Sequence, residues 1–252
     1  MNVDSYLSRL NYKGSLSPTH ETLRALQIAH MQSVPFENLD IVPLHRPISL
    51  ERAALWEKIV VRKRGGFCYE LNGLFSWLLD QLGFAVTHLN ARVFTRTGRL
   101  GIDFDHLALL VSAPDGHDRW LADVGFGDSF LQPLVLRDGE QPQGMHVYRL
   151  ERDAAGYVAW RKKRAADWER LYFFDLTPHN FPGEYEAACS YHQRSPESSF
   201  TRSPVISRAT EDGRISLERD RLILTLNGVR SERPVHSEEW PRVLAEQFGV
   251  VL

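Results

Sequence analysis

One of only two cysteines, Cys68, stands between a pair of glycines and the start of an apolar pattern, in the stretch RGGFCYELNGLF at residues 64–75. The unpaired N–H groups and the positive dipole end of a helix starting there would favour a thiolate and stabilise an oxyanion beside it. The sequence therefore predicts a nucleophilic Cys68 with a lowered pKa, although a small buried apolar residue explains a cysteine flanked by aromatic rings equally well. A core-facing amphipathic helix with Cys68 on its first turn is predicted by apolar residues that recur at spacings of three and four: Leu71, Leu74, Phe75, Leu78, Leu79 and Leu82.

A cysteine nucleophile needs a base and a group that orients the base. His106 heads the apolar strand pattern IDFDHLALLV, and Asp123 lies in WLADV shortly after it. If these segments form a hairpin with Ser112 opposite Arg119, Asp123 lies on the same face as His106, one diagonal away, at about 7–8 Å between Cα atoms. A slip of one residue would put them on opposite faces. Taken alone, His106 is explained as well by a hydrogen-bonded core histidine, and Asp123 by a carboxylate that caps a turn. Taken together, the two residues suggest a Cys-His-Asp triad with Cys68.

The elements that must position these residues change character along the chain. The first zone, to about residue 82, is helical, with Ser17 before Pro18 and Ser49 as expected helix starts. The next, to about residue 176, carries short β-branched and aromatic runs between turn signals, which indicates antiparallel strands in a barrel or sandwich. The last mixes a short helix at 184–192, strands and a closing helix.

Composition limits the classes of function. With 252 residues, 43% of them hydrophobic and 25% charged, the chain is expected to be soluble and to bury a full core. Lys and Arg total 30 against 32 for Asp and Glu, so no broad positive field favours a nucleic acid or membrane partner. The absence of a signal pattern and the two expected thiols favour the cytoplasm. No metal is expected, because the ten histidines lack ligand spacing, and Cys189 is predicted to be a buried structural thiol.

Two local charge patterns lie outside the expected triad. Arg64 and Glu37 are predicted to form an ion pair that ties the segment VPFENLD to the turn before Cys68. The basic run at residues 161–164 is predicted to be a solvated strand edge that discourages sheet pairing.

Four ordered blocks, VPFENLD at residues 34–40, RGGFCYELNGLF, FDHLALLV and LADVGFG, resemble the arylamine N-acetyltransferase family over nearly the whole chain. The resemblance implies an α+β fold with a helical bundle at residues 1–83, an antiparallel β-barrel at 84–182 and an α/β lid at 183–252. It implies a catalytic triad of Cys68, His106 and Asp123 in a geometry like that of cysteine proteases. The chain departs from the family at Asp105, where a small polar residue is more usual.

The same resemblance implies a ping-pong reaction of xenobiotic metabolism. Acetyl-CoA would acetylate Cys68, and an arylamine, arylhydrazine or arylhydroxylamine would then take the acetyl group. Coenzyme A would lie beside Gly125, Phe126 and Gly127. An apolar acceptor pocket is expected to be lined by Phe36, Val93, Phe126 and Phe200.

Three alternatives remain open at the level of sequence. An amide synthase of the same fold would close a macrolactam from a carrier-bound acyl chain. A cysteine hydrolase would use the same triad but admit water, and a ligand-binding protein would leave the triad idle. The physiological acceptor, the preferred acyl chain and the oligomeric state are left open as well.

Overall fold

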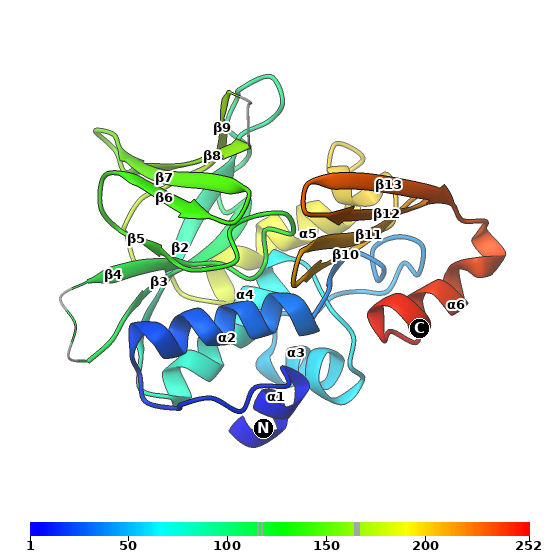
Figure 1. Ribbon diagram of the computed structural model, residues 1–252, viewed down its shortest axis with the longest axis horizontal. Coiled ribbons are helices and arrows are strands. Elements are labelled where there is room, and N and C mark those ends of the chain that lie inside the picture. The colour runs from blue at the N-terminus through cyan, green and yellow to red at the C-terminus, as the bar shows by residue number, and fades with distance from the viewer. Residues whose placement is uncertain (115, 117, 164–166) are drawn as a thin grey trace.

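The computed structural model describes residues 1–114, 116, 118–163 and 167–252 (Figure 1). The N-terminal part is helical, as the sequence predicts. Its helices are α1 (Val3–Arg9), α2 (His20–Ser33), α3 (Arg52–Trp56), which continues into a π-helical turn at Glu57–Val61, and α4 (Cys68–Gln81).

The expected helix starts are wrong by two residues in each case. The N-cap of α2 is Thr19, whose hydroxyl accepts the N–H of Thr22 at 3.3 Å, and not Ser17. The hydroxyl of Ser49 accepts the N–H of Glu51 at 3.2 Å, which itself precedes α3. Short polar side chains bond nearby backbone just outside a helix as readily as at its N-cap, which explains both errors.

Helix α4 is enclosed and not amphipathic. Every residue of Cys68–Leu79 is buried, because the helix lies between α1 and α3 on one side and strands β2 (Ala85–Val93) and β3 (His106–Ser112) on the other. The apolar stripe predicted from the sequence therefore accounts for only part of the surface that α4 buries. The largest core cluster joins these helices to strand residues such as Leu107 and Trp120.

Eight antiparallel strands curl into a nearly closed barrel, which confirms the expected barrel. The strand order is β5-β4-β3-β2-β9-β8-β7-β6, so β5 and β6 are the edges. Side chains bridge the gap between β5 and β6. The Gln141 side-chain amide donates to the carbonyl of Val135 at 2.9 Å and accepts the N–H of Val135 at 2.8 Å. The Gln143 side-chain amide makes the same pair of hydrogen bonds with the backbone of Gln132. The remaining strands are β4 (Arg119–Ala122), β5 (Leu134–Val135), β6 (Glu140–Gln143), β7 (His146–Arg152), β8 (Tyr157–Lys163) and β9 (Trp168–Phe174).

A second, five-stranded sheet stands beside the barrel (Figure 1). Its edge strand β1 (Phe36–Glu37) comes from the N-terminal region and pairs with β10, a contact that the sequence did not suggest. The division of the chain at residues 83 and 182 therefore remains a prediction. The other elements of this part are α5 (Glu186–Arg194), β10 (Val205–Thr210), β11 (Gly213–Glu218), β12 (Arg221–Leu226), β13 (Val229–Pro234), α6 (Trp240–Val243) and a π-helical turn at Leu244–Phe248.

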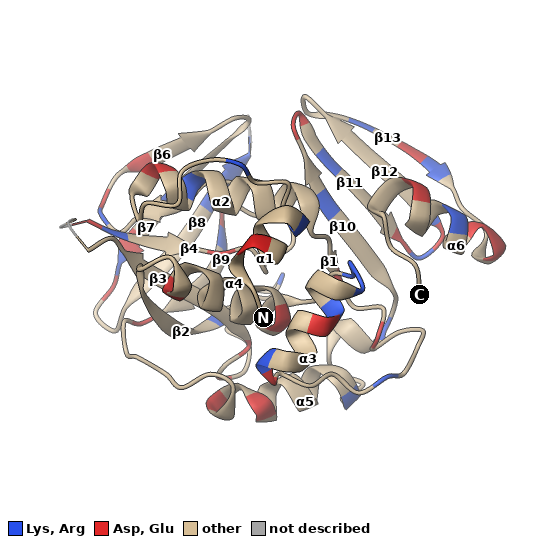
Figure 2. Ribbon diagram, turned by 90° about the horizontal axis from the view of Figure 1, so that it is seen from below, with Lys and Arg blue, Asp and Glu red and all other residues tan. Residues whose placement is uncertain are grey.

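Acidic and basic residues are both scattered over the helices and the two sheets (Figure 2). This mixture agrees with the near balance of charge in the sequence. In the part of the chain that the structure describes, no helix is both long and apolar enough to cross a membrane.

Candidate active site

Cys68 is the first residue of α4, as the sequence predicts. Glu70 accepts the N–H of Phe67 at 3.1 Å, which fixes the entry into the helix. The turn before it needs glycine because another chain segment passes very close: a Cβ on Gly65 would lie 1.9 Å from the carbonyl oxygen of Pro35. Glycine is therefore required at position 65 by this close approach.

His106 and Asp123 meet through the hairpin that their spacing predicts. Ser112 pairs with Arg119 in the β3–β4 ladder, which is the expected register. His106 begins β3 and Asp123 directly follows β4, and the N–H at Nε2 of His106 donates to Oδ2 of Asp123 at 2.8 Å. Both side chains are buried. Nδ1 is thereby left as the imidazole nitrogen that does not bond Asp123.

The Asp123 carboxylate accepts three further hydrogen bonds. The hydroxyl of Tyr172 donates to Oδ2 at 3.1 Å, and the Asn72 amide and the N–H of Gly125 each donate to Oδ1 at 2.8 Å. Burial alone would raise the pKa of Asp123, but the charge of His106 and these bonds to His106, Asn72 and Gly125 outweigh it, so the pKa lies below its usual value. Asp123 is therefore held as an anion beside the imidazole.

Asn72 is a site residue that the sequence reading missed. It lies one turn after Cys68 in α4 and is fully buried. Its amide donates to the carbonyl of Leu107 at 2.6 Å and to Asp123, and its oxygen accepts the N–H of Val124 at 2.9 Å. The available signal was an amide between Leu71 and Leu74, in the apolar stripe of the predicted helix. Asn72 ties the helix of Cys68 to both strands of the His106–Asp123 hairpin.

Gly125 brings the hairpin against the start of α4. A Cβ at this position would lie 2.7 Å from Cα of Cys68 and 2.8 Å from the Asn72 amide nitrogen, so only glycine fits. Leu107, next to His106, lies close enough for its N–H to favour a charged Cys68 sulfur. The start of α4 therefore lies against the hairpin that carries His106 and Asp123, although no hydrogen bond joins Cys68 to His106 among the described residues.

The expectation of a lowered thiol pKa is wrong for the site as the structure has it. Cys68 is 3% exposed, and burial raises its pKa well above the ordinary value. The N–H of Leu107 opposes this rise, whereas the nearby carboxylates of Asp105 and Asp123 add to it. The helix terminus alone does not compensate for desolvation, so a thiolate here needs a proton acceptor or a positive partner.

A buried ion network supports the turn before Cys68 and contains the predicted pair of Arg64 and Glu37. The Arg64 guanidinium donates to Glu37 at 2.7 Å and to Asp40 at 3.2 Å. The Lys58 ammonium lies 2.7 Å from both Asp40 and Glu70. Glu70 is also the residue that accepts the N–H of Phe67, so the network is continuous with the start of α4.

The residues expected to line an acceptor pocket are all partly exposed. The rings of Phe36 and Phe200 lie 6.2 Å apart between centroids, and a Cβ on Gly127 would contact Phe36 at 3.5 Å. Phe126 packs edge-on against the His106 imidazole at 5.3 Å and belongs to the same core cluster as Val93. Phe36 therefore lies beside Gly127 with Phe200 next to it, and Phe126, the chain neighbour of Gly127, lies against His106.

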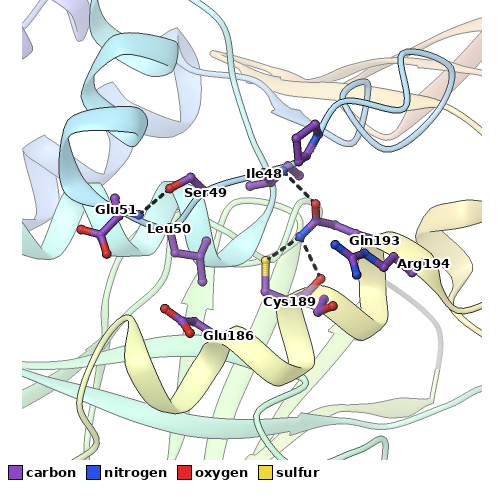
Figure 3. Close-up of a pocket in the computed structure, with 10 residues that line it drawn as sticks. Ile48, Ser49, Leu50, Glu51, Glu186, Cys189, Gln193 and Arg194 are labelled. Atoms are coloured by element: carbon purple, nitrogen blue, oxygen red, sulfur yellow. Dashed lines mark hydrogen bonds between the residues drawn. The ribbon is translucent and has the colours of Figure 1, made fainter.

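A separate cavity of about 240 Å³ lies between residues 47–51 and α5 (Figure 3). It is lined by Cys189, whose sulfur accepts a hydrogen bond from Gln193 at 3.3 Å, and by none of the expected site residues. Burial raises the pKa of Cys189 to about 12, as suits a structural thiol. Among the residues that the structure describes, no cluster of three or more potential ligands is placed to hold a metal ion.

Comparisons with known proteins agree with the resemblance carried by the four sequence blocks. A family profile described as N-acetyltransferase matches residues 19–252. The arylamine N-acetyltransferase of Mycolicibacterium smegmatis is 35% identical over 90% of this chain and 84% of its own length, and that of Mycobacterium tuberculosis strain H37Rv is 34% identical over 99% and 89%.

Solved structures give the same result. The arylamine N-acetyltransferase from M. tuberculosis superimposes with a TM-score of 0.91 at 32% identity, covering 99% of this chain and 94% of the other. The Mycobacterium marinum enzyme, solved in complex with CoA, also gives 0.91, at 30% identity over 99% and 93%. With the fold, the sequence blocks and full-length relatives in agreement, the chain belongs to the arylamine N-acetyltransferase family.

Proposed function

We propose that this acetyltransferase works by a ping-pong mechanism in which Cys68 is the nucleophile, His106 the base and Asp123 the residue that orients the base. The observation that carries the proposal is the buried His106–Asp123 hydrogen bond of 2.8 Å at the junction where α4 begins with Cys68. Asp123 bonds Nε2 of the imidazole, which leaves Nδ1 to exchange a proton with the sulfur.

Acetyl-CoA is the proposed donor, since the M. marinum relative was solved in complex with CoA. The segment Gly125–Phe126–Gly127 fits a role beside the donor, because it lies against Cys68 and its last two residues are partly exposed. In the first half-reaction, the sulfur of Cys68 attacks the thioester carbonyl while His106 takes the thiol proton. The bond from carbon to the CoA sulfur then breaks, and the CoA thiolate leaves with that proton.

An aromatic amine, hydrazine or hydroxylamine is the proposed acceptor in the second half-reaction. Its nitrogen attacks the acetyl-Cys68 thioester, the C–S bond breaks, and the nitrogen proton passes through His106 to the sulfur. Flat acceptors suit the partly exposed rings of Phe36, Phe126 and Phe200 together with Val93. The mechanism requires no metal, and the two free thiols fit a cytoplasmic location.

Intact-protein mass spectrometry tests the proposal directly. Mixing the protein with acetyl-CoA should add one acetyl group, which peptide mapping should locate on Cys68. Subsequent addition of an arylamine should remove that group and produce the acetylated amine. The Cys189→Ala variant should behave like the parent, whereas Cys68→Ala should take up nothing.

The same experiment separates the alternatives. Loss of the acetyl group to water at the same rate with and without amine would indicate a hydrolase. An adduct on Cys189, or one that persists in Cys68→Ala, would reject Cys68 as the nucleophile. No adduct on a folded protein would reject the ping-pong mechanism.

A further inference from the structure

The turn directly before His106 is held in a strained conformation. Phe104 has a φ of 58°, in the left-handed region that a bulky residue occupies only when its surroundings enforce it. The Tyr69 hydroxyl donates to the carbonyl oxygens of Phe104 and Asp105 at 2.7 and 3.1 Å. Since Tyr69 follows Cys68 in α4, one hydroxyl links the nucleophile's helix to the backbone that presents His106.

The Asp105 side chain anchors this turn from the other side. Its Oδ2 accepts the N–H of Val93 at 3.2 Å, and its Oδ1 lies 3.0 Å from Nε2 of His192 in α5. Nδ1 of His192 lies in turn 3.0 Å from the hydroxyl of Ser198. The result is a second, largely buried Ser-His-Asp arrangement next to the proposed triad.

This second arrangement has the geometry of a tether and not of a second nucleophile. Ser198 is 3% exposed, and its hydroxyl oxygen accepts the N–H of Phe200, so it caps the short 3₁₀ turn at Ser199–Thr201. The ring of His192 packs edge-on against Phe200 at 5.2 Å. Asp105 is thereby connected to the segment that carries one of the proposed acceptor-pocket rings.

Asp105 also brings charge to the nucleophile. Of the two carboxylates that raise the pKa of Cys68, Asp105 contributes more than Asp123. Asp123 already bonds His106, whereas among the described residues the Asp105 carboxylate accepts the Val93 N–H and lies 3.0 Å from Nε2 of His192 without a hydrogen bond to it. The ionisable groups around Cys68 come from α4, β3, α5 and the turns between them, and they are Tyr69, Asp105, His106, Asp123, Tyr185 and Cys189.

We propose that Asp105, whose carboxylate accepts the Val93 N–H and lies beside His192, is a positioning residue that fixes the turn presenting His106 and places a second negative charge beside Cys68. The inference rests on the proposed roles of Cys68 and His106. It makes Asp105 responsible for two separable effects. The contacts of its carboxylate with the Val93 N–H and His192 hold the turn, and its charge opposes formation of the thiolate.

Three variants in a Cys189→Ala background separate these effects. Asp105→Asn removes the charge but keeps an acceptor for the Val93 N–H. Asp105→Ala removes the charge, the hydrogen bond to the Val93 N–H and the contact with His192. Asp103→Asn is the matched control, because it removes a charge two residues earlier from a side chain that is 72% exposed. Thermal unfolding establishes that each variant is folded.

The first readout is the rate of Cys68 alkylation by iodoacetamide as a function of pH. Removing the charge in Asp105→Asn should lower the midpoint by about one pH unit, the scale of one charge acting across several ångströms of protein interior. Asp103→Asn should titrate with the parent. A midpoint for Asp105→Asn that coincides with the parent, or an equal shift in Asp103→Asn, would overturn the charge effect.

The second readout is the rate of acetyl transfer from Cys68 to an arylamine. Asp105→Asn should retain it within about threefold, whereas Asp105→Ala should lose at least about tenfold because the turn is released. Equal rates in the two variants would overturn the positioning role. The two proposals fail separately. If the parent protein is not acetylated, the proposed function is rejected. The pH profiles still decide the role of the Asp105 charge, because alkylation uses no acetyl donor.

Discussion

Replacing Asn72 by alanine tests whether α4 and the β3–β4 hairpin are held as one unit at the site. Asn72 makes three hydrogen bonds of 2.6 to 2.9 Å, all in the buried interior. Alanine would leave the N–H of Val124 without this partner and would remove one donor each from Leu107 and Asp123. The Asp123 oxygen concerned retains the N–H of Gly125, which limits its loss.

The expected destabilisation follows from these groups. A buried donor left unpaired costs about 1–3 kcal/mol, and each lost hydrogen bond to a group that keeps another partner costs about 1 kcal/mol. The free energy of unfolding should therefore fall by about 3–5 kcal/mol. For a chain of this size, that corresponds to a drop of roughly 10 °C in the unfolding midpoint. Because Asp123 loses one of its fixed partners, the rate of Cys68 acetylation should fall by at least about tenfold.

Urea denaturation and stopped-flow acetylation, both at a temperature where the variant is folded, measure the two effects. Ser76→Ala provides a matched control one turn further along α4, where Ser76 bonds the carbonyl of Gly73 at 2.8 Å and His88 at 2.9 Å. The control should lose about 1–2 kcal/mol and acetylate at the parent rate. If Asn72→Ala loses no more stability than Ser76→Ala and acetylates normally, Asn72 does not hold the site together.

Three further predictions concern buried charges. Asp123→Asn should leave a folded protein whose acetylation is greatly slowed, on the scale of the 10⁴-fold loss known for the orienting aspartate of a serine protease, and rapid-quench mass spectrometry checks this. Arg64→Met should lower the free energy of unfolding, measured by urea denaturation, by about 3–5 kcal/mol, because the buried carboxylates of Glu37 and Asp40 lose their guanidinium partner. A decrease below about 1 kcal/mol would contradict this prediction. Asp40 and Asp123 both have lowered pKa values; for Asp40, Lys58 and Arg64 outweigh the opposing effect of burial. The stability that these two carboxylates give the folded protein is therefore present above the unfolded carboxyl pKa of about 3.9. It is lost as the pH falls through their folded pKa values. Urea midpoints from pH 5 to pH 3 should therefore fall less steeply in Asp123→Asn than in the parent.

The His106–Asp123 contact was predictable because it depends on short-range rules. Side chains alternate between the two faces of a strand, and the position of the loop between β3 and β4 sets the register in which Ser112 pairs with Arg119. The position of Cys68 at a helix start followed in the same way from the glycine pair and the apolar spacing. Local sequence fixes these features, and tertiary contacts only confirm them.

The missed features depend on contacts between distant segments. Arg161, predicted to be a solvated strand edge, is buried because it bonds Asp128 and Glu169, while Lys162 and Lys163 of the same run are exposed; Arg164 lies outside the described residues. Periodicity does not reveal which member of a basic run meets a carboxylate from another element. The raised pKa of Cys68 has a similar origin, because the burial that raises it involves segments distant in sequence, such as β3 and the loop with Gly125, which pack against the start of α4.

The segment VPFENLD shows how a recognisable motif can serve the site without performing chemistry. Its members join the turn before Cys68 to other parts of the molecule. A buried ion network of this kind is costly to desolvate, so stability alone does not explain it. We infer that the network instead fixes how the turn before Cys68 meets β1 and the second sheet, because charges and amides accept only specific partners, whereas apolar side chains pack in many ways. The contacts are those of Pro35 with Gly65 and Gly66, Phe36 with Phe200, Glu37 and Asp40 with Arg64, Asp40 with Lys58, Asn38 with Phe200, Ser203 and Val205, and Leu39 with the core of the second sheet.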